Sequence, residues 1–135
     1  MALDLKVTNL SALSEAGYEF ELKLPDTNLG TGGFITVRGS NSPKVKEHGK
    51  KAFSTMQMKE TMAKRKGRDL DPMSLDEAEE MAVESALVRI INWRGITEGK
   101  DELKFEPDTA RRILKEHDWI RSQIIDESDA LANFI

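Results

Sequence analysis

Apolar and polar residues alternate in two short runs near the start of the chain, at 3–8 and 18–24. A period of two places alternate side chains on one face of a β-strand, so each run predicts a strand with one buried face. A third run, 34–38, is rich in residues that favour strands and follows the glycine-rich turn at 30–33. Three such strands form a small sheet whose apolar face must be covered, and we expect the helices that follow to pack against that face.

The run from Ser74 to Trp93 has the pattern of a helix that the rest of the chain surrounds. The Ser74 hydroxyl can accept a hydrogen bond from the Glu77 N–H while the Glu77 carboxylate bonds back to Ser74, which is a capping box. The first half is amphipathic, but from Val83 to Ile91 apolar side chains point in nearly every direction. Because a helix that is apolar on all sides is buried, we predict that this is the central helix of the domain.

Capping residues and prolines predict where the other helices begin. A serine N-cap followed by Pro43 begins a helix that runs to about Lys66, because the missing N–H of proline costs nothing in the first turn. Pro107 begins another helix in the same way, and Asp118 begins a last one. A single continuous helix over 107–133 is the alternative.

These elements predict one α+β domain over residues 1–135. Residues 1–41 form a β-rich part with a small N-terminal antiparallel sheet of about three strands, and residues 42–135 form a mainly helical part with about four helices. A chain of 135 residues can bury a sizeable core. It contains no cysteine, which excludes disulfides and a cysteine nucleophile.

Two further features bear on where the protein is found. No segment is apolar for long enough to span a bilayer, and the first residues lack the pattern of a signal peptide. We therefore expect a cytoplasmic protein that has no contact with a membrane.

Charge is distributed unevenly along the chain. Residues 44–68 contain nine of the 20 basic residues but only two of the 24 acidic ones. A helix this basic can follow a phosphate backbone, so nucleic-acid binding is an alternative function. The phosphate-binding residues would be Lys50, Lys51, Lys64, Arg65 and Arg68. The acidic total charge of −4 and the spread of lysines around the helix favour a protein partner instead, either the chain's own acidic stretch at 77–84 or a separate acidic protein.

No set of side chains has the spacing of a catalytic or metal site. His48 and His117 lie far apart in the sequence, and the glycines at 30–33 lack the spacing of a dinucleotide-binding or phosphate-binding loop. The acidic groups at 69–71 and 126–129 lack the ligand pattern of a calcium loop. We expect no catalytic residues, no cofactor and no bound metal, and hence no enzyme.

Six short segments from residue 35 onward form a characteristic set of helix anchors and turns. They are 35–43, 90–95, 103–105, 107–114, 119–124 and 133–134, and a charged helix follows the first of them. Together they resemble the tail assembly chaperones of long-tailed bacteriophages and prophages, of the siphovirus and myovirus types. The family's fold is mainly helical, so the strands at the front of this chain depart from it.

The resemblance implies a non-enzymatic role in virion morphogenesis. Members of this family bind the long and aggregation-prone tape measure protein, keep it soluble, and help tail tube protein polymerise around it. They act in the host cell cytoplasm and are absent from the mature virion. Homo-oligomers are common among them, and many phages make a second, C-terminally extended form by a frameshift. We therefore expect the tape measure protein, tail tube protein and further copies of the chain itself as partners.

Such a chaperone needs an adaptable apolar surface. The candidate partner-binding residues are Met56, Met58, Met62, Trp93, Trp119, Ile124, Leu131 and Phe134. Methionine adapts to partner helices, and the pair Met58 and Met62 is expected to be exposed, although filling gaps in a core is the alternative role. The two tryptophans either anchor the core or contact a partner.

Overall fold

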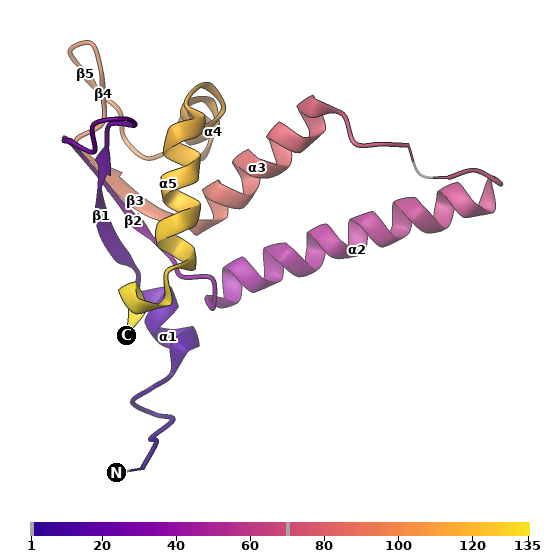
Figure 1. The fold of residues 1–135 in the computed structure, drawn as a ribbon, viewed down its shortest axis with the longest axis horizontal. Helices are drawn as coiled ribbons and strands as arrows, with labels where there is room; N and C mark the ends of the chain where they lie inside the picture. The colour runs from indigo at the N-terminus through magenta and orange to yellow at the C-terminus, as the bar shows by residue number, and fades with distance from the viewer. Residues whose placement is uncertain (1, 70) are drawn as a thin grey trace.

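A three-stranded antiparallel sheet carries the body of the molecule in the computed structural model, which describes residues 2–69 and 71–135 (Figure 1). Strand β1 (Tyr18–Lys23) pairs with β2 (Gly30–Val37), and β2 pairs with β3 (Ile90–Arg94). The α+β class and the three-stranded antiparallel sheet are confirmed. The third strand, however, comes from the middle of the chain, so the sheet is not built from the N-terminal part alone.

The prediction of a strand at 3–8 was wrong. These residues form a turn, in which the Val7 and Thr8 N–H groups donate to the Asp4 carbonyl. The side chains of Leu3, Leu5 and Val7 are each at least 70% exposed. Alternation alone does not make a strand, because a strand also needs a neighbour to hydrogen-bond with and an apolar surface to lie on.

The predicted central helix over 74–93 is two elements. Helix α3 (Leu75–Arg89) begins at the predicted cap, where the Ser74 hydroxyl accepts a hydrogen bond from the Glu77 N–H at 3.1 Å. It ends at Arg89, and β3 follows without a loop. The long apolar run therefore belongs to a helix and a strand in succession.

A bulge in β3 explains why this boundary was missed. Val83 and Ala86, three residues apart, are buried on the helix, while Ile90 and Trp93, also three apart, are buried on the strand. In the pairing with β2, Ile91 is an extra residue without a partner, which turns Ile90 and Trp93 to the same face. The buried residues thus keep the three-residue spacing of a helix through a stretch that is a strand.

The described residues contain five α-helices, one more than the sequence predicted. The additional helix is α1 (Leu10–Ala16), which the Asn9 side chain caps by accepting from the Ala12 N–H. Helix α2 (Pro43–Arg65) has the predicted Ser42 cap and a proline in its first turn. Helices α4 (Pro107–Glu116) and α5 (Asp118–Asp129) are separate, because the chain leaves the helical conformation at His117.

Two small elements complete the chain. A two-stranded hairpin joins β4 (Thr97–Glu98) to β5 (Asp101–Glu102), and a 3-10 helix, η1 (Leu131–Phe134), follows α5. Gly95, which follows β3, has a φ of 72°. Among the described helices, none combines the length and the apolar character that crossing a membrane would require.

One core lies between the sheet and three helices. Helix α5 packs on β1 and β2, and α3 packs on both α4 and α5. The buried residues of this core are Phe20, Leu22, Ile35, Val37, Val83, Ala86, Ile90, Trp93, Ala110, Ile113, Leu114, Ile120, Ile124 and Phe134. We call the sheet, α4, α5 and the part of α3 that packs on them the body. Among the described apolar residues, Val45 and Ala63 of α2 are the buried ones that lie outside this core.

Helix α2 stands apart from the body. In Figure 1 it projects away from the sheet, and α3 returns to the body at an angle to it. Of its 23 residues, only Val45 and Ala63 are buried. Because a helix usually buries one whole stripe of side chains, much of the surface of α2 is left uncovered by the residues that the structure describes.

Candidate functional site

The feature with the clearest functional meaning is the projecting pair of helices, which we call the arm and define as residues 43–69 and 71–84. Thirteen large apolar side chains are exposed in the described residues, and six of them lie on the arm. They are Phe53, Met58, Met62, Met73, Leu75 and Met81. Apolar side chains concentrated in this way are typical of protein-binding surfaces.

One side of α2 carries the predicted pair of methionines. Met58 and Met62 are 66% and 54% exposed, and their spacing of four residues places them side by side on the helix. They line a hollow of about 460 Å³ together with neighbours that include Ser54, Gln57 and Arg65. We call this surface the methionine face. It is a shallow apolar patch with a polar border.

A second surface lies between α2 and α3, and we call it the arm groove. Its volume is about 460 Å³. The residues that line it are His48, Gly49, Ala52, Lys59, Met73, Glu77, Glu80, Met81, Glu84 and Ser85. The charged residue from α2 is Lys59, and those from α3 are Glu77, Glu80 and Glu84, so the two walls have opposite sign.

The charges of the two walls are not paired with each other. Among the ion pairs of the described residues, α2 takes part only in Lys51–Glu47, which lies within the helix at 3.2 Å. On α3, Glu84 pairs with Arg111 of α4 at 2.6 Å, and Glu79 approaches Arg121 of α5 at 4.0 Å. The basic and acidic helices therefore pack together as expected, but arginines of the body take the acidic partners.

The proposed phosphate-binding residues are all exposed, but they do not form one site. Lys64 and Arg68 line a hollow at the far end of α2, together with Asp69. Lys50 and Lys51 lie about 20 Å away at a rise of about 1.5 Å per residue. The structure thus spreads these basic residues along the length of α2 and the residues that follow it, with the acidic Asp69 beside Lys64 and Arg68.

Three of the predicted partner-binding residues lie in the core. Trp93 is 6% exposed, and its indole Nε1–H donates to the Leu103 carbonyl at 2.8 Å. Ile124 and Phe134 are 0% and 5% exposed, and Phe134 packs edge-on against Tyr18. In this fold the body covers these three side chains, so they cannot contact a partner protein.

The other predicted residues remain accessible to different degrees. Met56 is half-buried and lies on the side of α2 that carries Val45 and Ala63. Leu131 is 43% exposed on η1, far along the chain from the arm. Trp119 is half-buried and packs against the core. Of the eight candidates, Met58 and Met62 are therefore the ones that share an open surface.

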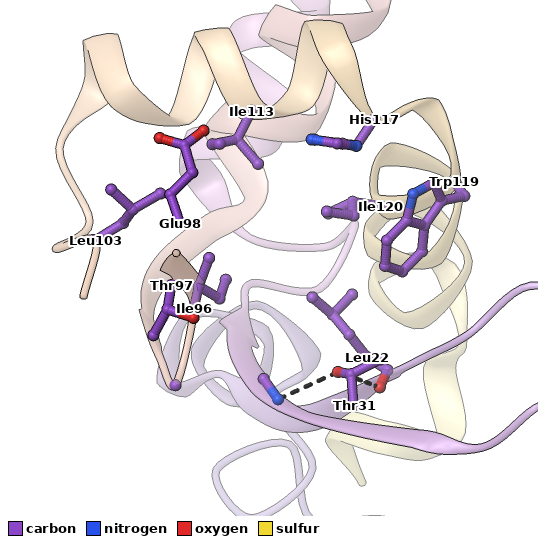
Figure 2. A pocket seen from close by; sticks show the side chains of 12 residues that line it. Leu22, Thr31, Ile96, Thr97, Glu98, Leu103, Ile113, His117, Trp119 and Ile120 are labelled. Atoms are coloured by element: carbon purple, nitrogen blue, oxygen red, sulfur yellow. Dashed lines mark hydrogen bonds between the residues drawn. The ribbon is translucent and has the colours of Figure 1, made fainter. Parts of the chain in front are cut away.

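Trp119 also borders a pocket of about 300 Å³ in the body. Figure 2 shows Ile113 and His117 on one side of this pocket and Leu22 and Thr31 on the opposite side. The walls are mostly apolar, and the Thr31 hydroxyl is engaged, since it donates to the Leu22 carbonyl at 2.8 Å. The pocket is a gap between the sheet, the β4–β5 hairpin, α4 and the start of α5.

The carboxylate that lines this pocket, Glu98, is already paired with an arginine. Glu98 accepts two hydrogen bonds from Arg112, at 2.8 and 3.0 Å. These bonds, and to a smaller extent the charge of Arg112, lower the pKa of Glu98. A carboxylate held ionised in this way is a poor general base. In addition, no group of three or more His, Asp or Glu residues in the described ranges could hold a metal ion.

Sequence reasoning missed a partly buried polar junction at the base of the arm. Arg38 donates through Nε to Glu15 at 3.1 Å and through Nη1 to the carbonyls of Val88 and Ile90 at 3.0 Å each. The Ser42 hydroxyl, which caps α2, also donates to Glu15. These bonds tie α1, α2 and the α3–β3 boundary together, and so they fix the direction in which α2 leaves the body.

No local signal could have found this junction. Its members come from separate parts of the chain, and they include a fully buried serine, Ser128, which donates to the Arg38 carbonyl at 2.6 Å. Only the cap at Ser42 was predicted, because capping is a local property. The Glu15 carboxylate occupies the N-terminus of α2, the place where an anionic ligand would otherwise bind. We therefore regard the junction as structural.

Comparison with known proteins gives one finding. A family described as YdaY prophage protein matches residues 45–135, which is 91 of the 135 residues. The chain belongs to the YdaY prophage protein family. Neither a curated protein nor a solved structure matches it. In this YdaY family chain, the matched region holds both walls of the arm groove and the methionine face, while β1 and β2 lie outside it.

The YdaY match confirms the prediction of a bacteriophage or prophage protein. The narrower assignment to tail assembly chaperones stays a prediction.

Proposed function

We propose that this YdaY family chain is a non-enzymatic chaperone of phage tail assembly. In this role it binds the tape measure protein in the host cell cytoplasm, keeps it soluble and promotes assembly of the tail tube around it, and it leaves before the virion is mature. Two findings support the proposal. The chain belongs to a prophage family, and its exposed apolar side chains are concentrated on a projecting arm.

The observation that carries the proposal is the methionine face. A tape measure protein is long and apolar, so its chaperone must cover many similar segments without being specific for one of them. Unbranched, polarizable methionine side chains such as Met58 and Met62 adapt to different apolar shapes. A shallow patch also gives modest affinity for each contact, which allows tail tube protein to displace the chaperone.

Co-expression with a tape measure protein encoded by the same prophage tests the proposal. We expect the client to become soluble and to co-purify only when this chain is present. Met58→Ser with Met62→Ser should abolish most of that solubilisation. Leu24→Ser with Leu29→Ser is the matched control, since these side chains are 45% and 62% exposed on the β1–β2 loop. A client that stays insoluble beside the wild-type chain would refute the chaperone proposal.

A second candidate function is binding of nucleic acid. It is favoured by the exposure of the five predicted phosphate-binding residues, of which only Lys51 has an ion pair within the described part of the chain. Fluorescence anisotropy with a DNA and an RNA oligonucleotide would test it. A phosphate binder loses affinity steeply between low and physiological salt, whereas contact through methionines does not. Affinity with a steep salt slope would favour this second function over the first.

A further inference from the structure

The arm groove points to a partner of its own. We infer that two copies of this chain pair through it, with α2 of one copy lying against α3 of its partner. The inference is independent of the proposed chaperone function, because it uses a different surface from the methionine face. It also names an interface, which a general expectation of homo-oligomers does not.

Charge identifies a second copy as the occupant. A two-fold dimer places the same patch of both copies face to face, so a patch of one sign would repel itself. A patch that is half positive and half negative is complementary to itself after the two-fold rotation. In the arm groove, α2 contributes the basic Lys59, and α3 contributes the acidic Glu77, Glu80 and Glu84. The groove therefore has one wall of each sign.

The chain leaves this complementarity unused. Lys59, Glu77 and Glu80 line the same groove, yet none of them takes part in an ion pair among the described residues. Figure 1 shows why, since α2 and α3 diverge away from the body. In a two-fold pair, each α2 would have an acidic α3 on both sides. The four helices would then alternate in sign around a bundle.

The apolar residues of the groove fit the same arrangement. Met81 and Met73 are 44% and 41% exposed there, opposite the small residues Gly49 and Ala52 of α2. A Cβ built on Gly49 would meet nothing within 4 Å, so the space above it is open. A helix surface without large side chains allows a second helix to approach closely. The partner's side chains would therefore fill this space.

The methionine face remains available in this pair. Around α2, at about 100° per residue, Met58 lies about 140° and Met62 about 100° away from the side that carries Val45 and Ala63. Pairing through the groove and binding of a client through the methionine face can therefore be measured separately. A negative result for the pairing would not contradict client binding, and a negative result for client binding would not contradict the pairing.

Reversing the charge of one wall at a time tests the pairing. Glu77→Lys with Glu80→Lys makes both walls positive, and His48→Glu with Lys59→Glu makes both walls negative. We expect the wild-type chain to sediment as a dimer, each variant alone to pair at least about tenfold more weakly, and an equimolar mixture of the two variants to form a heterodimer. Restored pairing in the mixture cannot arise from misfolding.

A matched control has the same change in charge outside the arm. Asp101→Lys with Glu102→Lys alters two exposed residues of the β4–β5 hairpin. This variant should pair as the wild-type chain does. If it loses pairing as well, net charge and not the groove governs association, and the inference is wrong.

Gly49→Gln separates pairing from folding. Replacing a helical glycine that has open space around it should raise the melting temperature of the monomer, while the longer side chain fills the groove and weakens pairing about tenfold. The inference is overturned if the wild-type chain is monomeric at about 100 μM. It is also overturned if either wall variant pairs normally, if two folded wall variants fail to pair when mixed, or if Gly49→Gln pairs as the wild-type chain does.

Discussion

At the residue scale, Glu15 holds the base of the arm through charge. Its carboxylate accepts hydrogen bonds from the Ser42 hydroxyl and from Arg38. The bond from Ser42 is the main cause that lowers the pKa of Glu15, and the bond from Arg38 adds to it. A carboxyl group with a lowered pKa stabilises the fold above its unfolded pKa, and this stabilisation is lost as pH falls through the folded pKa.

Glu15→Gln should therefore change the pH dependence of stability. At neutral pH the variant is expected to unfold at lower urea concentration than the wild-type chain. The difference should shrink on acidification below about pH 4, where the wild-type carboxyl becomes protonated. Urea titrations followed by circular dichroism at several pH values measure it. A difference that stays constant down to pH about 3 would mean that the ionised carboxylate contributes nothing.

Gly39 is a residue at which the junction tolerates no side chain. A Cβ there would lie 2.6 Å from the Ser14 Oγ and 3.0 Å from the Phe134 Cδ2. Both neighbours are buried, so neither can move away easily. Gly39→Ala is expected to lower the free energy of unfolding by about 1–3 kcal/mol, the usual cost of overpacking.

Gly49 is the matched control for this substitution. It lies within α2 and has open space around it. Gly49→Ala should raise the free energy of unfolding by about 0.5–1 kcal/mol, because alanine favours a helix more than glycine does. Both free energies come from the same urea titrations. Equal effects of the two substitutions would contradict the packing described around Gly39.

At the scale of elements, the parts that the sequence predicted correctly have local causes. The caps at Ser42 and Ser74 and the first-turn prolines act within a few residues, and α2, α3 and α4 begin where these residues stand. Strands depend on neighbours that are distant in the sequence. The run at 3–8 therefore alternates without pairing, and β3 was hidden in a helical spacing.

The same distinction applies to the candidate site. Helical spacing placed Met58 and Met62 side by side, and both are exposed. Spacing could not show that Trp93, Ile124 and Phe134 are covered, because their burial depends on which elements of the fold pack against them. The groove was missed for the same reason, since two helices line it.

The N-cap of α3 gives a test at this scale. Ser74 is exposed, and its hydroxyl accepts from the Glu77 N–H, so its contribution is that of the cap alone. Ser74→Ala should lower the free energy of unfolding by about 1 kcal/mol, whereas Ser74→Asp, which can also cap, should change it little. Thermal or urea unfolding measures both variants. Equal losses for the two variants would show that the hydroxyl does not act as a cap.

At the scale of the whole molecule, the body and the arm differ in how their surfaces are covered. The body has one continuous core between the sheet and three helices. The arm buries few side chains, and its exposed residues include large apolar side chains and charged groups that form few ion pairs in the described ranges. Regions with few buried contacts open at lower free energy than the core does. The arm is therefore expected to open locally while the body stays folded.

Hydrogen exchange measures both the local opening of the arm and the pairing of two copies in one experiment. In dilute protein, amides in the second half of α2 should exchange faster than those of α4 and α5, which pack against the core. At concentrations where two copies pair, protection should rise along α2 and in the first half of α3, and it should not change in α4 and α5. The wall variant Glu77→Lys with Glu80→Lys should show the dilute pattern at every concentration. If the arm is as well protected as the body in dilute protein, the arm does not open locally. If the protection of the arm does not change with protein concentration, two copies do not pair through it.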